Sequence, residues 1–301
     1  MRASTKTNRR KFLKRSAEIS SAALGTAYLI PGSALGKDGQ VAPNDRINLG
    51  SIGVGSMGRN DMKTLRTAEG TQVWAVCDVF KQLREQAKSI FDENYGNNDC
   101  KVYNDFRDLL ARKDIDAVCI TTQDHWHALI AVAAVEAGKD MYCQKPLGTT
   151  VAECQAIREA VRGNNRVFQT GTQQRSDRSF RFACELARNG YLGKIHTVEV
   201  AAPGPKYKRM YRKPTGVEPV PEGFDFDMYV GPAKARPHNG GLYAWPDWYL
   251  IRDYCVGFIV NWGVHHLDIA NWGCPVVTSE PSEFEFTGSY RDDGLTDNIN
   301  D

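Results

Sequence analysis

The sequence predicts an α/β fold in which a parallel, doubly wound sheet occupies residues 46–148. Two observations predict it: short apolar runs alternate with segments of helical composition through this region, and a glycine-rich turn follows the first apolar run. Because parallel strands need a crossover connection, strands separated by helices of about 10–15 residues indicate such a sheet. Ligands of these sheets bind beyond the carboxyl ends of the strands.

The elements are expected in a regular order. Apolar runs bounded by turn residues predict strands, and helix-compatible stretches closed by a glycine, such as Gly138 or Gly190, predict helices. The predicted strands are residues 47–54, 73–78, 115–122, 140–143, 167–171, 194–201 and 284–287. The predicted helices are residues 57–67, 81–94, 106–112, 129–137, 151–163, 179–189 and 257–272.

The turn Gly53-x-Gly55-x-x-Gly58 predicts a dinucleotide site. The first glycine allows a tight turn, the second lets the backbone approach a pyrophosphate, and the third lets helix pack on strand. The helix N-terminus then faces the anion. The second apolar run ends at Asp78, 20 residues after Gly58, where a carboxylate meets the hydroxyls of the adenosine ribose. A purely structural turn between strand and helix is the alternative interpretation.

Asp78 also predicts the choice of cofactor. A carboxylate there hydrogen-bonds the ribose 2′-hydroxyl and repels a 2′-phosphate, so we expect NAD rather than NADP. Lys81 is the nearest basic residue in the sequence that could weaken this preference. Together with Asp78 and the three glycines, the expected cofactor-binding residues are Ser56, Met57, Thr121, Thr122, His127, Gln144 and Lys145.

The charge is distributed unevenly along the chain. Of 301 residues, 42% are hydrophobic and 25% charged, and the formal net charge is +2. Residues 1–36 carry seven basic residues and one acidic residue, which leaves 31 basic and 35 acidic residues elsewhere, a net charge of −4. This balance gives no indication of nucleic-acid binding. The length allows two domains.

Residues 1–36 are expected to be a targeting segment, followed by a linker over residues 37–45. Paired arginines lie in Asn8–Lys14, a mildly apolar stretch follows over Ser16–Ile30, and small residues come next. The segment is a poor membrane span. It resembles a bacterial twin-arginine export signal, which implies a periplasmic or otherwise exported protein with no membrane anchor after cleavage. A disordered basic tail is the alternative.

The eight cysteines are expected to be small buried hydrophobic residues. Cys77, Cys119 and Cys143 lie in strand-like runs, and the sequence contains no C-x-x-C or metal-ligand spacing. Disulfides are the alternative in an exported protein. We expect no metal site.

The composition of the sequence changes in its second half, after residue 149. Residues 203–247 are rich in proline, glycine and aromatic residues without clear periodicity, which indicates a functional loop region. Residues 207–262 hold 12 of the 30 aromatic residues. An aromatic-rich concave surface suits a sugar, whose C–H faces pack on rings. The alternative is that these rings form a core.

The predicted helix over 257–272 carries the candidate catalytic histidine. Asn261, His265 and Asp268 fall at i, i+4 and i+7, on one face of the helix. With an unperturbed pKa near 6.5, His265 can take the proton of a substrate hydroxyl while the adjacent carbon gives up hydride. Asp268 either orients His265 or binds a substrate hydroxyl. Further candidates for the substrate pocket are Asn261, His127 and Arg175.

Together these features resemble the glucose–fructose oxidoreductase, inositol dehydrogenase and MocA (Gfo/Idh/MocA) superfamily. The motifs that carry the resemblance, over residues 46–290, are the glycine turn with Asp78, Asp116–His127, Ala137–Pro146 and Gly257–Asp268. The resemblance implies a Rossmann dinucleotide-binding domain over 46–148 and an α+β domain with an open sheet over 149–301. It also implies Lys145 as a donor at the reacting oxygen. The second domain is expected to be incomplete at its C-terminus.

Two residues depart from the family's pattern. Gln144 stands where the family has Glu in its Glu-Lys-Pro signature, and Asn261 stands for the first Asp of its Gly-x3-Asp-x3-His-x2-Asp pattern. The hypothesis is that both amides keep the shape but remove negative charge, so Lys145 and His265 have lower pKa values than in relatives. Replacing Asn261 by Asp is then expected to move the basic limb of the pH–rate profile upward.

The sequence therefore predicts an exported NAD-dependent oxidoreductase that removes hydride from a sugar, polyol or glycoside. The alternatives are a redox-neutral glycosidase or lyase that retains NAD, and a non-catalytic, nucleotide-dependent sugar-binding protein. Because no NAD pool is expected outside the inner membrane, the purified protein is expected to carry NAD(H) with slow release. The expected partners are a small carbohydrate or polyol and, in a homo-oligomer, further copies of the chain.

Overall fold

The computed structural model describes residues 41–42, 45–201, 216–240, 243, 247–275, 283 and 285. The chain divides into two compact units, residues 1–46 and residues 47–301. In the first unit, the Arg46 guanidinium donates a hydrogen bond of 2.9 Å to the Val41 carbonyl. The predicted targeting segment lies outside the described residues, as does the predicted strand 284–287 apart from residue 285.

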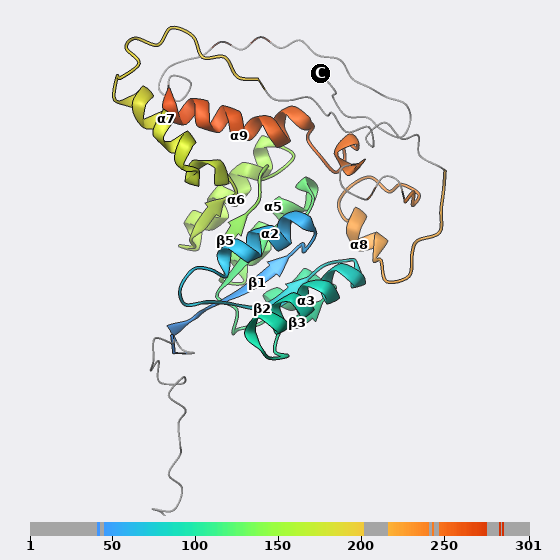
Figure 1. Ribbon diagram of the computed structural model, residues 1–301. Helices are drawn as coiled ribbons and strands as arrows, with labels where there is room; N and C mark the ends of the chain where they lie inside the picture. Colours follow the sequence, from blue (N-terminus) through green and yellow to red (C-terminus); the bar gives the residue numbers. More distant parts are fainter. Residues whose placement is uncertain are drawn as a thin grey trace, which may run out of the picture. The chain divides into compact units, whose positions relative to one another are not determined.

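The second unit is built on one parallel sheet (Figure 1). Its described residues form six strands in the spatial order β3-β2-β1-β4-β5-β6, and every neighbouring pair is parallel. The strands are β1 (Ile47–Ile52), β2 (Thr71–Cys77), β3 (Lys101–Tyr103), β4 (Ala117–Ile120), β5 (Asp140–Cys143) and β6 (Phe168–Thr170). The strand order reverses between β1 and β4, and ligands of doubly wound sheets bind at such a switch point.

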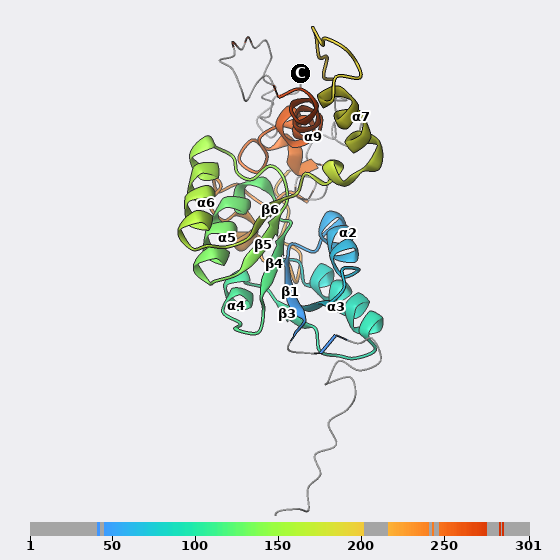
Figure 2. The ribbon, with the colours of Figure 1, turned by 90° about the vertical axis from the view of Figure 1, so that its left-hand side faces the viewer.

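Helices cover both faces of this sheet (Figure 2). The helices of the sheet domain are α2 (Ser56–Leu65), α3 (Lys81–Tyr95), α4 (Phe106–Leu110), α5 (Asp124–Glu136) and α6 (Val151–Gly163). Helices α2 and α3 lie on one face, and α4, α5 and α6 lie on the other. Those that follow are η3 (Gln173–Ser176), α7 (Arg178–Arg188), α8 (Phe226–Val230), η5 (Asp247–Leu250) and α9 (Phe258–Gly273), and α7 lies against α9.

The apolar strands are buried because helices cover both of their faces. On one face, Ile52 and Ile120 pack with Ala131 of α5 in a single buried cluster. On the other face, Met62 of α2 and Phe91 of α3 belong to a second cluster. This double coverage explains why the central strands carry buried apolar residues on both faces.

The sheet extends beyond residue 148, where the sequence placed the end of the first domain. Residues 168–170 form β6, which pairs in parallel with β5 and so belongs to this sheet. The preceding helix α6 is its crossover, and Thr150 caps it in a reciprocal capping box with Glu153. The strand at 167–171 was predicted, but its partner could not be read from the local sequence.

Three further elements differ from the predictions. β3 was not predicted, because three residues give too short a pattern. Helix α5 begins at Asp124, five residues before the predicted start, and its polar first turn resembled a loop in the sequence. The predicted strand over 194–201 is wrong: this stretch is exposed and irregular, and it pairs with no strand in the described part of the chain.

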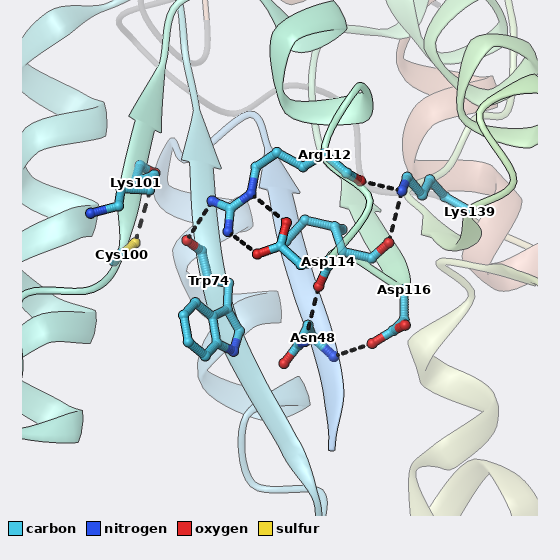
Figure 3. A network of polar contacts seen from close by, with 9 residues as sticks. Asn48, Trp74, Cys100, Lys101, Arg112, Asp114, Asp116 and Lys139 are labelled. Carbon is cyan, nitrogen blue, oxygen red and sulfur yellow. Dashed lines mark hydrogen bonds and ion pairs between the residues drawn. The ribbon is translucent and has the colours of Figure 1, made fainter. Parts of the chain in front are cut away.

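The edge of the sheet where the strands begin is held by its own polar network (Figure 3). The Asn48 side chain donates a hydrogen bond of 2.9 Å to the Asp114 carbonyl. The Arg112 guanidinium binds the Asp114 carboxylate at 2.9 Å and the Trp74 carbonyl at 3.3 Å, and the Lys139 ammonium donates to the Arg112 carbonyl. These polar groups thus form hydrogen bonds with one another at the amino ends of the strands. The carboxyl ends of the strands lie on the opposite side of the sheet.

Candidate functional site

A cavity of about 790 Å³ lies where β1, β2 and β4 end. Its volume falls in the range of about 300–1,000 Å³ typical of small-molecule sites. Its walls come from the turns after the strands and from α8, η5 and α9. All predicted cofactor-binding residues line it, together with Asn261 and His265, whereas Arg175 and Asp268 do not.

The glycine turn shapes one end of the cavity. A Cβ atom added to Gly53 would lie 2.4 Å from the Thr121 carbonyl oxygen, and one added to Gly58 would lie 2.0 Å from the Gly53 carbonyl oxygen. Gly53 also has a φ of +85°. At Gly55 an added Cβ would meet no described atom within 4 Å, so space is open in front of the backbone. The turn therefore has room for a bound group at its middle glycine.

Helix α2 begins at this turn with free backbone donors. Gly55 is its N-cap residue, and no side chain of the described residues caps it. The first N–H groups of a helix have no partner within the helix, and they bind phosphate groups readily. The turn and the helix start thus fit the pyrophosphate of a dinucleotide.

Asp78 lies at the end of β2 and lines the cavity. Its Oδ2 accepts from the Val54 backbone N–H at 2.8 Å, and its Oδ1 accepts from the Phe80 N–H at 2.9 Å. Burial raises the pKa of this carboxyl, against the two backbone donors. Arg84, rather than Lys81, is the basic side chain next to it, because the Arg84 guanidinium donates to the Asp78 carbonyl at 2.9 Å.

Lys145 and Asn261 meet at the other end of the cavity. The Lys145 ammonium donates to the Asn261 side-chain oxygen at 2.8 Å and to the Asn261 carbonyl at 3.1 Å. The Asn261 amide nitrogen lies 3.2 Å and 3.4 Å from the two oxygens of Asp124, the first residue of α5. The sequence interpretation missed Asp124, because it placed the helix start at Leu129.

Gln144, the residue before Lys145, also donates to a buried carboxyl group, that of Asp61. Its amide nitrogen donates to Oδ2 of Asp61, on α2, at 2.8 Å. Thr121 lies 3.4 Å from the same oxygen. Burial raises the pKa of Asp61, and the hydrogen bond from Gln144 opposes this shift. Asp61 was also missed, since nothing in the local sequence connects it to Gln144.

The hypothesis that both amides lower the pKa values of Lys145 and His265 below those of relatives stays a prediction, and the structure adds to it. Each amide donates to a buried carboxyl group, Asn261 to Asp124 and Gln144 to Asp61, but only Asn261 also contacts the Lys145 ammonium. The pKa of Lys145 is lowered, but burial is the first cause, and Asp124 acts in the opposite direction.

His265 lies on α9 with its side chain at the cavity. Burial, followed by the charge of Lys145, lowers its pKa to about 4. Its Nδ1 is buried and has no hydrogen-bond partner among the described residues. The Trp262 ring lies edge-on to the imidazole, with 6.3 Å between ring centroids. With this pKa the imidazole is neutral at pH 7, while its unpartnered Nδ1 is shielded from solvent.

Asp268 and Arg175 are paired with each other. The Arg175 guanidinium donates two hydrogen bonds of 2.6 Å to the Asp268 carboxylate and stacks over the Trp272 ring at 5.4 Å. Neither lines the cavity, although Asp268 contributes a weak electrostatic stabilisation to protonated His265. The pair joins η3 to α9.

His127 lines the cavity, and both of its ring nitrogens contact backbone carbonyls of neighbouring loops. Its Nδ1 lies 2.6 Å from the Pro146 carbonyl, and its Nε2 lies 3.0 Å from the Thr122 carbonyl. Burial lowers its pKa to about 4. With both nitrogens against backbone oxygens, its role is to fix the chain after Lys145.

The aromatic residues of the second half divide between a core and the cavity. A buried cluster contains Phe224, Tyr229, Tyr243, Ile251 and Tyr254. Phe80 stacks on Phe224, with 3.9 Å between ring centroids. His125 and Trp126 both donate to the Tyr229 carbonyl at 3.1 Å, and Trp126 also lines the cavity, in agreement with a pocket role expected from its place after a strand. Trp248, Tyr249 and Trp262 line the cavity.

Three remaining features complete the description. All eight cysteines are free thiols, six of them buried. Among the described residues, no group of three His, Cys, Asp or Glu side chains is placed to hold a metal ion. Within the same residues, no helix combines the length and hydropathy needed to cross a membrane.

Residues 47–172 match the family model described as oxidoreductase family, NAD-binding Rossmann fold (GFO_IDH_MocA). An inositol 2-dehydrogenase of Salmonella paratyphi B is 35% identical over 150 residues, which cover 49% of this chain and 43% of the relative. A glycosyl hydrolase family 109 protein of Shewanella baltica is 30% identical over 213 residues, 64% of this chain and 45% of that protein. The matched parts thus span less than half of either relative.

The fold is also found in a solved structure. An oxidoreductase domain protein from Kribbella flavida is similar with a TM-score of 0.55 and 22% identity. The similarity covers 76% of this chain and 54% of that one. It therefore includes more of the chain than the sheet domain alone.

Proposed function

From the premise that this chain belongs, through residues 47–172, to the Gfo/Idh/MocA family of NAD-dependent oxidoreductases, we propose that it oxidises a hydroxyl of a sugar or polyol. The observation that carries the proposal is that Lys145 and His265 line the same cavity as the glycine turn. A cofactor held at the turn and a substrate beside these two side chains would share one enclosed space. The relative named inositol 2-dehydrogenase makes an inositol-like polyol the first substrate class to test.

The residues of the cavity fit NAD. Free donors at the start of α2 and the open space before Gly55 suit its pyrophosphate. Asp78 suits a ribose hydroxyl, since each of its oxygens accepts one backbone hydrogen bond and retains capacity for another. When bound, NAD accepts a hydride from the substrate carbon.

Lys145 and His265 have different roles at the substrate hydroxyl. A neutral His265, whose side chain lines the cavity, accepts the hydroxyl proton. Lys145 donates a hydrogen bond to the same oxygen and stabilises negative charge as it develops. Asn261 holds the ammonium of Lys145 in place at 2.8 Å.

The test is a panel of inositols and sugars with the full chain and added NAD, followed by NADH absorbance. His265→Ala is the catalytic variant, and His266→Ala is its matched control on the neighbouring helix position. Turnover with wild type and His266→Ala, and its loss with His265→Ala, is the expected pattern. Equal turnover in all three proteins would remove His265 from the reaction.

A redox-neutral glycosidase is the second candidate. The glycosyl hydrolase family 109 relative favours it, because its similarity extends over 213 residues, beyond the sheet domain. In this reaction the hydride returns to the sugar after the glycosidic bond is cleaved, so no NADH accumulates. A chromogenic glycoside distinguishes the two: release of the aglycone without added NAD and without NADH supports the glycosidase.

Retention of NAD fits either activity. Residues 222–230 dock on the turn after β2: the Lys81 N–H donates to the Gly223 carbonyl at 2.7 Å, and the Asp225 N–H donates to the Val79 carbonyl at 3.0 Å. The Asn104 side chain donates to the Asp225 carboxylate at 2.6 Å. Val79 and Asn104 both line the cavity. We expect the docked segment 222–230 to slow the release of NAD. Purified protein should therefore release NAD into solution when it is denatured.

Export through the twin-arginine pathway is part of the proposal and rests on the sequence of residues 1–36. Replacing Arg9 and Arg10 by lysine in the full chain is the test. Wild type is expected in the periplasmic fraction, and the double-lysine variant is expected to remain in the cytoplasm. An unchanged distribution would remove the export assignment. A homo-oligomer is also proposed, and sedimentation of the purified chain tests it.

A further inference from the structure

We propose that Asp124 is a positioning residue of the reaction, whose buried carboxylate acts on Lys145 through the amide of Asn261. The inference rests on the proposed function, since it assigns a role around the same lysine. It goes beyond a simple loss of charge at Asn261, because a buried carboxylate faces the nitrogen of the Asn261 amide whose oxygen contacts the ammonium.

The geometry forms a continuous chain of hydrogen bonds. The Lys145 ammonium donates to the oxygen of the Asn261 amide at 2.8 Å, and the nitrogen of that amide faces the Asp124 carboxylate at 3.2 Å and 3.4 Å. Only one orientation of the amide satisfies both neighbours, because a cation needs the oxygen and a carboxylate needs the nitrogen. Two opposite charges therefore fix the rotamer of Asn261, and Asn261 in turn fixes the ammonium.

The Asp124 carboxylate is held where burial alone would not favour a charge. The side chain is only 1% exposed. It accepts a hydrogen bond of 3.3 Å from the Val256 N–H, and the Cys255 thiol is a further hydrogen-bond partner. The residue is also the first of the 13-residue helix α5, where the helix dipole favours an anion. The partners come from the segment directly before α9 and from α9 itself, whereas Asp124 belongs to α5, so two parts of the chain meet at this carboxylate.

The groups that face this chain of contacts are few. Around Asp124 the titratable groups are Lys145 and Cys255. Around Lys145 they are Asp124, Cys255, Asp61, His265 and His127. Burial raises the pKa of Asp124 to about 6, so the carboxylate is charged above that pH and neutral below it. Loss of its charge lowers the pKa of Lys145, because the ammonium then has less negative charge to stabilise it.

The Gln144–Asp61 pair repeats this construction and provides a matched control. Asp61 is also buried and also accepts from an amide, at 2.8 Å. The amide of Gln144, however, does not contact the Lys145 ammonium; its oxygen accepts from the Lys145 backbone N–H at 3.3 Å. Neutralising Asp61 therefore removes a buried carboxylate of the same kind without breaking the contact with the ammonium.

The experiment measures the pKa of Lys145 directly, by NMR of full-length protein with isotope-labelled lysine, assigned with Lys145→Arg. Asp124→Asn is expected to lower this pKa by about one unit, the lower end for removal of a nearby opposite charge. Asn261→Asp, which places a carboxylate on the ammonium, is expected to raise it. The double variant Asp124→Asn/Asn261→Asp is expected to return it to or above the wild-type value. Asp61→Asn is expected to change it less than Asp124→Asn does.

The pH profile of turnover provides the second readout, and it is expected to shift in the same direction as the Lys145 pKa in each variant. The same Lys145 pKa in wild type and Asp124→Asn would overturn the inference, as would a shift in Asp61→Asn as large as in Asp124→Asn. If wild type oxidises no polyol and cleaves no glycoside while the NMR shifts occur as expected, the proposed function fails, and of the inference the coupling of Asp124 to Lys145 through Asn261 stands. If turnover is normal and the shifts are absent, the inference alone fails.

Discussion

Replacing Phe224 by alanine should loosen residues 222–230, the segment that docks on the turn after β2 beside Asp78. Phe224 is 7% exposed, its ring lies 3.9 Å from that of Phe80 between centroids, and Tyr229 meets it edge-on at 5.5 Å. Truncating a buried phenylalanine costs about 3–5 kcal/mol. Because the cluster around Phe224 is separate from the two clusters of the sheet, we expect the cost to fall on docking of residues 222–230 rather than on the whole fold.

A loss of about 3 kcal/mol raises the open fraction of the docked segment by about a hundredfold. Release of NAD that requires opening should accelerate by a similar factor. Stopped-flow release of NAD(H) fluorescence measures this, and hydrogen exchange shows whether residues 222–230 have opened. Phe182→Ala is the control, because Phe182 is 60% exposed on α7 and should change stability by less than about 0.5 kcal/mol. Opening of 222–230 with an unchanged rate of NAD release would refute the reasoning.

Three other outcomes are expected. Lys145→Ala and His265→Ala should each lower turnover by about 10²–10⁴-fold with an unchanged circular dichroism spectrum, and near-normal turnover of either would contradict its role. Gly58→Ala should destabilise the protein by more than about 1–3 kcal/mol and abolish NAD binding, because its Cβ would lie 2.0 Å from a backbone oxygen. Gly163→Ala is the control: an added Cβ there meets nothing within 4 Å, so thermal unfolding should show a gain in stability of up to about 1 kcal/mol. Titration should show NAD binding about tenfold or more tightly than NADP, and comparable affinities would count against the role of Asp78.

The sheet domain could be predicted because its signals are local. Apolar runs and glycine punctuation lie next to the elements that they specify, so five of the six strands and the helices between them were predicted close to their observed bounds. β3 and the start of α5 were missed for a physical reason. A three-residue edge strand has almost no pattern, and the first turn of α5 is polar because its side chains bind distant segments.

The candidate site could be predicted only in part. The lining residues in the turns after the strands followed from the rule that strand ends meet at one edge, and Asn261 and His265 came from the helix pattern. Their partners could not be predicted, because the Asn261–Asp124 contact joins residues 137 positions apart and Gln144–Asp61 joins residues 83 apart. Single-residue interpretation therefore counted the two amides as lost charges. Arg175 and Asp268 were each assigned to substrate for the same reason, and the structure pairs them 93 positions apart.

These sequence separations set an order for folding during synthesis. The sheet is complete once residue 170 has left the ribosome, whereas the contacts that close the cavity need residues 223–265. Long-range contacts form late because their loop-closure entropy is large. A nascent chain should therefore expose an open nucleotide-binding edge for the time needed to translate about 90 more residues, at about 5–20 residues per second. Cofactor that enters during this interval would be enclosed as α9 docks, so loading of the protein becomes a step of its biogenesis.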